Sequence, residues 1–397
     1  MSEMPAFTRL PSEEEASVRQ WIDDHRTDAT WQKPEIIDYS DLGRLKKLIE
    51  LGKIATVSDN RDYFLDEFAE LADPKLYADE ERRTELLTHP DILERANGVW
   101  VIFPWTREAV HYPQEADYYD LRTSRFRNLI TRDEQDKLHE PRIAIAGLSV
   151  GSNLVGSLVQ AGIGGSLVMS DMKNPKVSNI GRAGYDIRDI GVPKIDAIAR
   201  KISHIDPFLE QIHIPEGITA ETVSQLEAAR PDMIIDEVDD MVASALLRKL
   251  ARKLKVPYIS AADVGDRAVL EVCRHDLSDK APLYAGHVGD KVADRLVSGR
   301  MTEIEKMLVF ARSIGFRRLS PELIESAVQV GETLSGLPQL GRTAMMSAAL
   351  ATGAIHHIIL GNDVGTGIYT MKSPVSKRAS ISGALLAVTT VVKYARS

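Results

Sequence analysis

The residues with the clearest chemical potential lie between Arg142 and Lys194. An apolar run enters a turn that contains Gly147 and Gly151, and a helix rich in small residues follows. A second apolar run then leads to Asp171. Strand, glycine turn, helix and strand in this order are typical of a unit that binds an adenine nucleotide, with backbone N–H groups against the phosphates. Asp171 lies about twenty residues after the turn, where such units hold the ribose hydroxyls with an acid.

The segment after Asp171 carries groups suited to the far phosphates of ATP. It contains the amide of Asn179 and the cations of Arg182 and Lys194. Here the sequence resembles the ThiF/MoeB/ubiquitin-activating-enzyme family of adenylating enzymes, in which an Asp is followed by Ser-Asn-Leu, an Arg and a later Lys. This chain has Asp171, the run Ser178-Asn179-Ile180, Arg182 and Lys194, and the resemblance extends from about residue 122 to 361.

The resemblance implies an ATP- and Mg²⁺-dependent enzyme that adenylates a carboxylate. It assigns phosphate binding to the backbone around Gly147 and Gly151 and ribose binding to Asp171. It assigns the stabilisation of the α- and leaving phosphates to three residues, Asn179, Arg182 and Lys194. The family's metal-binding acid corresponds to Asp239, within the acidic run 236–240, and an arginine of segment 122–127, here Arg125, is expected to reach the γ-phosphate across a homodimer.

The chain departs from the family pattern in its cysteines and its glycine turn. With Cys273 as its single cysteine, it lacks the paired CxxC zinc knuckles and the crossover-loop cysteine of many members. This implies that the activated acyl group passes directly to a nucleophile without an enzyme thioester. The acid, which the sequence does not identify, is a peptide, a protein tail or a small acid. Ser149, Val150 and Ser152 stand where the family usually has glycine.

Three other functions are alternatives to the interpretation as an adenylating enzyme. The run from Gly147 to Gly151 also spells GxSxG, the nucleophile elbow of α/β-hydrolases, with Ser149, Asp239 and His275 in a possible triad order and His287 as a second candidate base. A glycine turn with a ribose acid also suits an NAD-dependent oxidoreductase. The third alternative is a non-catalytic protein that binds a nucleotide or peptide.

Cys273 is expected to be a structural residue. It ends the alternating run from Arg267, which predicts a strand with Leu270 and Val272 on one face and Glu271 and Cys273 on the other. Sharing a face with Glu271 makes a half-exposed thiol possible. No base is evident beside it, and a neighbouring carboxylate disfavours a thiolate.

Composition restricts the class of protein. The 397 residues carry a net charge of −9, which gives no support for a nucleic-acid partner. No apolar run is long enough for a transmembrane helix, and the first residues lack the layout of a secretory signal. A single cysteine fits a reducing compartment. These features predict a cytoplasmic protein with no membrane partner.

The predicted fold class is α/β, with a doubly wound, mostly parallel Rossmann-like sheet. Strands are expected near residues 143, 167, 210, 232 and 256, with the run 267–273 as an antiparallel extension. Residues 1–115 form an α+β appendage of unreadable role, with a helix opened by a capping box at Ser12 and Glu15 and a strand from Val99. Residues 116–397 form the adenylating domain. It becomes helical from Met301, and its helix 344–360 ends at Gly361.

Overall fold

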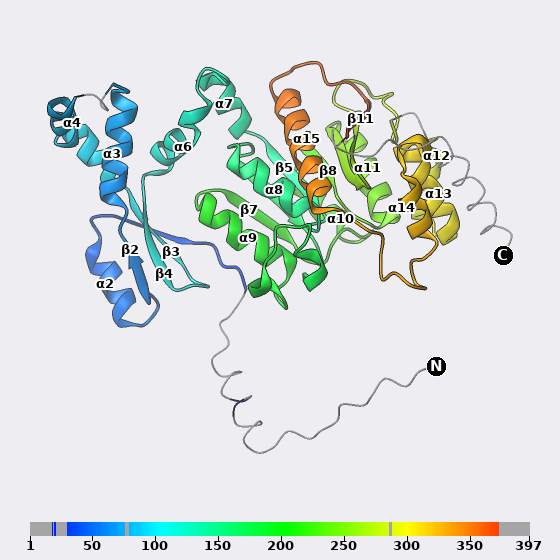
Figure 1. Ribbon diagram of the computed structural model, residues 1–397, viewed down its shortest axis with the longest axis horizontal. Helices are drawn as coiled ribbons and strands as arrows, with labels where there is room; N and C mark the ends of the chain where they lie inside the picture. Colours follow the sequence, from blue (N-terminus) through cyan, green and yellow to red (C-terminus); the bar gives the residue numbers. More distant parts are fainter. Residues whose placement is uncertain (1–17, 19, 21–29, 76–78, 286–287, 373–397) are drawn as a thin grey trace.

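The computed structural model describes residues 18, 20, 30–75, 79–285 and 288–372. The capping box predicted at Ser12 and Glu15 lies outside these residues. Figure 1 shows three parts along the longest axis: a small sheet with helices in blue, a central sheet covered by helices, and a group of yellow helices. In the described part of the chain, no helix has the length and apolar character needed to cross a bilayer.

The N-terminal part is a four-stranded sheet in the order β1-β3-β4-β2. Its strands are β1 (Glu35–Asp38), β2 (Thr56–Ser58), β3 (Val99–Phe103) and β4 (Glu108–Tyr112), and its helices are α2 (Leu42–Glu50), α3 (Arg61–Ala72), α4 (Glu80–Leu87) and α5 (Pro90–Asn97). The predicted α+β character and the strand from Val99 are therefore confirmed. Gly98, with φ +54°, separates α5 from β3. The domain boundary at residue 115 stays a prediction.

The central sheet has seven strands in the order β11-β10-β9-β8-β5-β6-β7. The strands are β5 (Arg142–Ala146), β6 (Ser166–Ser170), β7 (Glu210–Ile214), β8 (Met233–Asp236), β9 (Pro257–Val264), β10 (Arg267–Arg274) and β11 (Gly367–Lys372). Strands β5 to β9 are mutually parallel, whereas β10 pairs antiparallel with β9, and β11 pairs antiparallel with β10. The five parallel strands and the antiparallel extension are confirmed. The edge strand β11 was not predicted, because its exposed Tyr369 and Met371 give no alternation of buried and polar residues.

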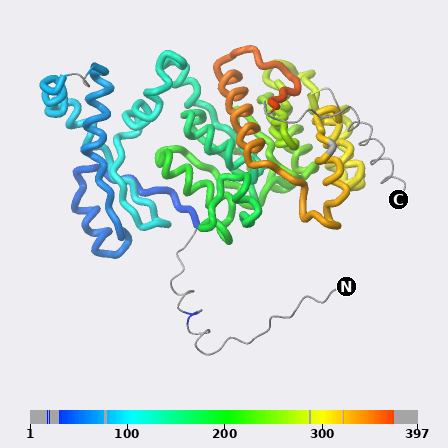
Figure 2. The backbone as a smooth tube through the Cα atoms, in the orientation of Figure 1, coloured from blue at the N-terminus to red at the C-terminus, as the bar shows by residue number. Residues whose placement is uncertain are grey.

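Helices cover both faces of this sheet, as the prediction of a doubly wound fold requires. One face packs against α8 (Gly151–Gln160), α9 (Lys194–Ile205) and α15 (Gly341–Ile359), and the other against α10 (Val223–Ala228) and α11 (Met241–Leu254). In Figures 1 and 2, α15 lies beside α8 although the two are far apart in sequence, and the Thr352 hydroxyl donates to Ser157 Oγ across 2.9 Å. The chain order thus gives one buried core on each face of the sheet.

The remaining helices flank the central sheet. They are α6 (Glu115–Thr123), η2 (Ser124–Phe126), α7 (Arg132–His139), η3 (Val177–Asn179), η4 (Ile187–Asp189), α12 (Lys291–Val297), α13 (Glu303–Ile314), η5 (Phe316–Arg318) and α14 (Pro321–Ala327). The helical character expected from Met301 is therefore confirmed up to β11. The helix predicted at 344–360 begins slightly earlier, at Gly341, and Gly361 with φ +73° follows its end as predicted.

The strand order places a topological switch between β5 and β8. From β5 the chain moves outward through β6 and β7, and it then returns to lay β8 on the other side of β5. Open α/β sheets bind ligands outside the carboxyl ends of their strands at such a point. Here the two carboxyl ends nearly touch. Gly147 has φ +92°, and a Cβ atom on it would lie 2.3 Å from the carbonyl oxygen of Glu237.

This close approach predicts that Gly147→Ala destabilises the fold. The added methyl group must push β5 and β8 apart, and the alanine must adopt a left-handed backbone conformation. Together these effects should lower the free energy of unfolding by about 2–4 kcal/mol. The matched control is Gly156→Ala in the middle of α8, where an added Cβ meets no atom within 4 Å. That control should gain up to about 1 kcal/mol from helix propensity. Urea unfolding of both variants checks the prediction, and equal stabilities would contradict it.

Candidate nucleotide site

The turn after β5 presents free backbone donors at the start of α8. The N–H of Gly147 donates to the Ser170 carbonyl across 2.8 Å and ties the turn to the end of β6. Among the described residues, the N–H groups of Ser149, Val150 and Gly151 have no hydrogen-bond acceptor. Orphan donors at a helix N-terminus favour an anion such as a phosphate. The turn therefore keeps its capacity for phosphate although three of its residues depart from glycine.

Asp171 joins the end of β6 to this turn. Its Oδ2 accepts a 2.8 Å hydrogen bond from the N–H of Leu148, and its Oδ1 accepts one of 2.8 Å from the N–H of Lys173. The same Oδ2 lies 3.8 Å from Nζ of Lys194, and the two side chains are 9% and 6% exposed. The structure thus brings together three predicted elements of the site: the glycine turn, the acid and the lysine.

Lys194 is held at the first position of α9, where its N–H donates to the Lys173 carbonyl across 3.0 Å. Burial lowers the pKa of its ammonium group, while the carboxylates of Asp171 and Asp239 act in the opposite direction. The positive charges of Lys173 and Arg182 add to the lowering. Three cations and two acids therefore share one region at the carboxyl edge of the sheet, and an added polyanion would relieve the repulsion among the cations.

The segment between Lys176 and Gly184 forms a folded loop over the turn. Asn179 is buried, and its Oδ1 accepts from the N–H of Lys176 across 2.8 Å. Arg182 donates through Nη1 to the Ser178 carbonyl across 2.6 Å, and its buried Nε has no hydrogen-bond partner among the described residues. The loop is attached to α8, because Ser152 Oγ accepts a hydrogen bond from the N–H of Gly184 across 2.8 Å. Ser152, which replaces a family glycine, thus anchors the loop that carries Asn179 and Arg182.

Two acids of the run 236–240 make structural hydrogen bonds, and a third, Asp239, is exposed to solvent. Asp236 is buried and accepts from the Tyr258 hydroxyl and from the N–H of Val238. Asp240 caps α11 through hydrogen bonds from the first N–H groups of that helix. Asp239 is exposed, and no hydrogen bond or ion pair with another described residue engages it. The described residues contain no group of three His, Cys, Asp or Glu side chains that could enclose a metal ion.

The prediction from sequence missed three polar residues at this edge: Glu237, Asp263 and Gln339. Glu237 is half-buried, and its pKa is raised by burial and by the nearby charges of Asp236 and Asp263. Asp263, near the end of β9, accepts from Nε2 of Gln339 across 2.9 Å, and burial raises its pKa to about 6. The signal was an acid inside the otherwise apolar strand 257–264. Gln339 gave none, because only the fold brings it to β9.

The predicted cross-subunit arginine is not connected to this site within the chain. Arg125 is exposed, lies in η2 and forms no ion pair with any described residue. Its neighbour Arg122 is structural, since it pairs with Asp206 at 2.7 Å and also donates to the Val159 carbonyl. The assignment of Arg125 to a phosphate in a partner subunit stays a prediction.

The geometry excludes the hydrolase triad through His275. Because β10 runs antiparallel to β9 with Arg274 opposite Pro257, the end of β10 lies at the amino edge of the parallel strands. Ser149 and Asp239 lie at the carboxyl edge. His275 is also buried, and neither of its ring nitrogens has a hydrogen-bond partner. The other candidate base, His287, lies outside the described residues.

Cys273 lies near the amino edge too, opposite Tyr258 in the register of β9 and β10. The two predicted faces of β10 are confirmed, with Leu270 and Val272 in one core and Cys273 in the other. The half-exposed thiol that the alternation allowed is wrong: Cys273 is fully buried, because its face packs against α11. Burial raises the pKa of the thiol to about 12, assisted by the charge of Glu271.

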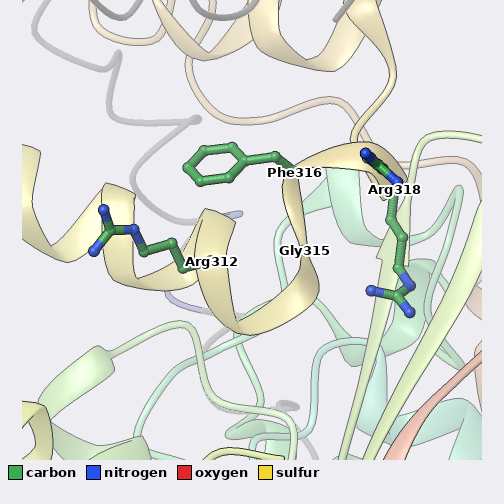
Figure 3. Close-up of a pocket in the computed structure, with 5 residues that line it drawn as sticks. Arg312, Gly315, Phe316 and Arg318 are labelled. Atoms are coloured by element: carbon green, nitrogen blue, oxygen red, sulfur yellow. The ribbon is translucent and has the colours of Figure 1, made fainter. Parts of the chain in front are cut away.

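A separate, open pocket lies at the end of α13 and shares no residue with the carboxyl-edge cluster. Its lining residues are Arg312, Gly315, Phe316, Arg317 and Arg318. Figure 3 shows Arg312 on the helix, and Gly315, Phe316 and Arg318 in the segment that follows it. Arg318 closes this segment by donating to the Ile314 carbonyl across 2.9 Å. Cations beside the last carbonyls of a helix are a common stabilising arrangement.

Comparison with known proteins agrees with the geometry of the carboxyl edge. The ThiF family model matches residues 122–380, more than half of the chain. The chain belongs to the ThiF family. It is 32% identical over 278 residues to the uncharacterized protein MT1398 of Mycobacterium tuberculosis, a match that covers 70% of this chain and 38% of that protein.

Other ThiF-type relatives are more distant. The chain is 28% identical over 138 residues to the sulfur carrier protein ThiS adenylyltransferase of Escherichia coli, covering 34% of this chain and 54% of the relative. The solved E. coli tRNA N6-threonylcarbamoyladenosine dehydratase with AMP has a TM-score of 0.44 and 18% identity, and the match covers 61% of this chain and 95% of that chain. This chain thus spans well under two thirds of the curated relatives described above.

The burial of Cys273 predicts that the thiol is inert in the native protein. Because the thiolate is the reactive species and the pKa of this thiol is about 12, few molecules carry it at pH 8. Iodoacetamide should leave the native protein unmodified for hours and modify it within minutes in denaturing urea. Intact-mass spectrometry with and without urea measures this, and rapid native alkylation would contradict the described position of Cys273.

Proposed function

We propose that this chain is an ATP- and Mg²⁺-dependent adenylating enzyme that activates a carboxylate and transfers the acyl group without an enzyme thioester. The observation that carries the proposal is the joining of Asp171, Lys194 and the Gly147 turn at the β5–β8 switch point. A polar cluster at this place, with free N–H donors and a buried lysine, suits a nucleotide whose phosphates need positive charge.

The order of groups along the carboxyl edge fits one direction of the nucleotide. Asp171 follows β6 and would hold the ribose, while the donors of Ser149, Val150 and Gly151 follow β5 and would contact phosphate. Asn179, Arg182 and Lys194 border this position. A carboxylate oxygen of the substrate attacks the α-phosphorus and pyrophosphate leaves. The protein has little covalent chemistry to perform in this step, so catalysis is positioning and the neutralisation of growing negative charge.

Asp239 suits a magnesium ion that accompanies ATP. Mg²⁺ is usually held by one or two carboxylates together with phosphate oxygens and waters, so it needs no enclosing group of protein ligands. Asp239 is exposed at the end of β8, within electrostatic reach of Lys194. The ion would neutralise charge on the phosphates, and Asp239 would hold it there.

The acid substrate is a peptide, a protein tail or a small acid. One relative is named for adenylating the sulfur carrier protein ThiS, which favours a peptide or protein tail. Direct transfer is supported by the place of Cys273, buried near the amino edge and away from the nucleotide cluster. We also propose a cytoplasmic homodimer in which the exposed Arg125 reaches the partner's nucleotide.

The proposal predicts exchange of labelled pyrophosphate into ATP that depends on an acid. A panel of pentapeptides, each ending in a different one of the twenty amino acids, and a set of small acids would be tested with ATP and Mg²⁺. At least one acid should stimulate exchange, and omission of Mg²⁺ should abolish it. Tight ATP binding without exchange for any acid would instead indicate a non-catalytic binding protein, and NAD binding in place of ATP an oxidoreductase. A covalent adduct on Cys273 would contradict direct transfer.

The charge argument predicts that Arg182→Ala and Lys194→Met reduce the adenylation rate more than ATP binding. Charge on the leaving pyrophosphate grows in the transition state, so the rate of exchange should fall by about 10²–10³-fold. The dissociation constant for ATP should change by less than about tenfold. Arg188→Ala is the matched control, since Arg188 lies in the same segment but is exposed and pairs with Asp186. Equal losses in rate and binding would mean that these residues act only in the ground state.

A further inference from the structure

Asp263 occupies a fixed position at the carboxyl end of β9. Its Oδ1 accepts a 2.9 Å hydrogen bond from Nε2 of Gln339. Gln339 lies in the segment before α15, and that segment is tightly attached. A Cβ on Gly341 would lie 2.4 Å from the Gly181 carbonyl oxygen, and Thr343 Oγ1 donates to the Gly265 carbonyl across 2.8 Å. Asp263 is thus held between β9 and a segment that also packs against the loop of Arg182.

The second oxygen of the same carboxylate has no hydrogen-bond partner. Asp263 Oδ2 is buried and accepts from no described residue. A buried acceptor without a donor is unfavourable, so such an atom in a site marks the place of a donor on a ligand. The groups that act electrically on Asp263 are Arg182, Asp239 and Glu237, and none of them donates to Oδ2.

The place of Asp263 along the edge distinguishes it from the nucleotide-binding groups. The carboxyl ends run from β6 with Asp171, through β5 with the glycine turn and β8 with Asp239, to β9 with Asp263. If ribose and phosphates occupy the first three positions, the acyl group and its acceptor lie over the fourth. Asp263 then lies on the side from which an acceptor would approach the activated carbonyl.

We propose that Asp263 is the general base of the acyl-transfer step, accepting through Oδ2 the proton of an amine acceptor. This inference rests on the proposed function. The amine nitrogen forms a bond to the acyl carbon, the bond from that carbon to the phosphate oxygen breaks, and AMP leaves. The proton released by nitrogen moves to Asp263 and then to solvent, so no further reagent is needed. Burial raises the pKa of Asp263 to about 6. Asp263 is therefore a stronger base than an ordinary aspartate, and it is still ionised at neutral pH.

The proposal separates the two half-reactions. In adenylation the attacking group is a carboxylate that has already lost its proton, so a base has no proton to remove. In transfer the attacking amine must lose a proton as its bond to carbon forms. A general base in the second step therefore leaves the first step unchanged, whereas a metal ligand or phosphate-binding residue alters the first step.

The test uses the full chain, ATP, Mg²⁺ and the panel pentapeptide that gives the fastest pyrophosphate exchange. Transfer is measured with two probe nucleophiles, glycinamide and hydroxylamine, by mass spectrometry of the products. Hydroxylamine attacks activated acyl groups at neutral pH without help from a base. Asp263→Asn is the main variant, and Gln339→Leu removes the amide that orients it. Asp294→Asn is the control, since Asp294 is an exposed acid on α12 that pairs with Lys249 of α11.

Asp263→Asn should lower transfer to glycinamide by about 100-fold, the range expected for a lost general base, while exchange and transfer to hydroxylamine stay within about threefold. Gln339→Leu should lower glycinamide transfer by about fivefold to tenfold, and Asp294→Asn should leave both reactions unchanged. Retained exchange demonstrates that the variants are folded. If Asp263→Asn leaves glycinamide transfer unchanged, or lowers exchange and transfer equally, Asp263 is not the general base. The proposed adenylation function is not affected by that outcome. Absence of exchange in the unmodified chain with every acid overturns the proposed function and this inference with it.

Discussion

The contact between the Gly147 backbone and the Glu237 carbonyl is the constraint on which the site depends. It fixes the carboxyl ends of β5 and β8 side by side at the point where the sheet reverses its direction of growth. The turn that offers N–H donors and the loop that carries Asp239 are continuations of these two strands. Any side chain at position 147 would separate them. The first glycine is therefore required by strand packing, whatever the turn binds.

Several buried charged groups at this edge are held by hydrogen bonds and ion pairs. Asp171 accepts from the turn and faces Lys194, so the cation points at the turn even though burial disfavours its charge. Beneath the β8 loop, Asp236 accepts from Tyr258, and the buried Arg248 pairs with Glu271 at 2.7 Å. Such a network costs desolvation energy and gains rigidity. Within the run 236–240, Asp239 is exposed and forms no hydrogen bond or ion pair with another described residue.

The sequence alone predicted the parts of the fold that depend on local patterns. Strands β5, β6 and β8 are largely apolar runs bounded by turns, and α15 is a long apolar helix ending before Gly361, so the apolar pattern was sufficient there. Asp171 was located by its spacing from the turn, and Lys194 by the family resemblance of the segment that follows Asp171. Burial of Cys273 was not predictable from alternation, because α11, which covers that face, lies elsewhere in sequence. Gln339 was missed for the same reason, since its partner Asp263 is 76 residues away.

The antiparallel direction of β10 separates its last residues from the carboxyl edge of the sheet. A chain that continued with parallel strands would bring the end of β10 to the nucleotide edge. Reversal of β10 instead carries Cys273 and His275 to the amino edge, where burial keeps both without a role in the nucleotide cluster. The same reversal makes the β9–β10 turn part of the carboxyl edge, and α15 is fastened to it through Thr343. This is why an acid, Asp263, and an amide, Gln339, lie together at the carboxyl edge beside the β9–β10 turn.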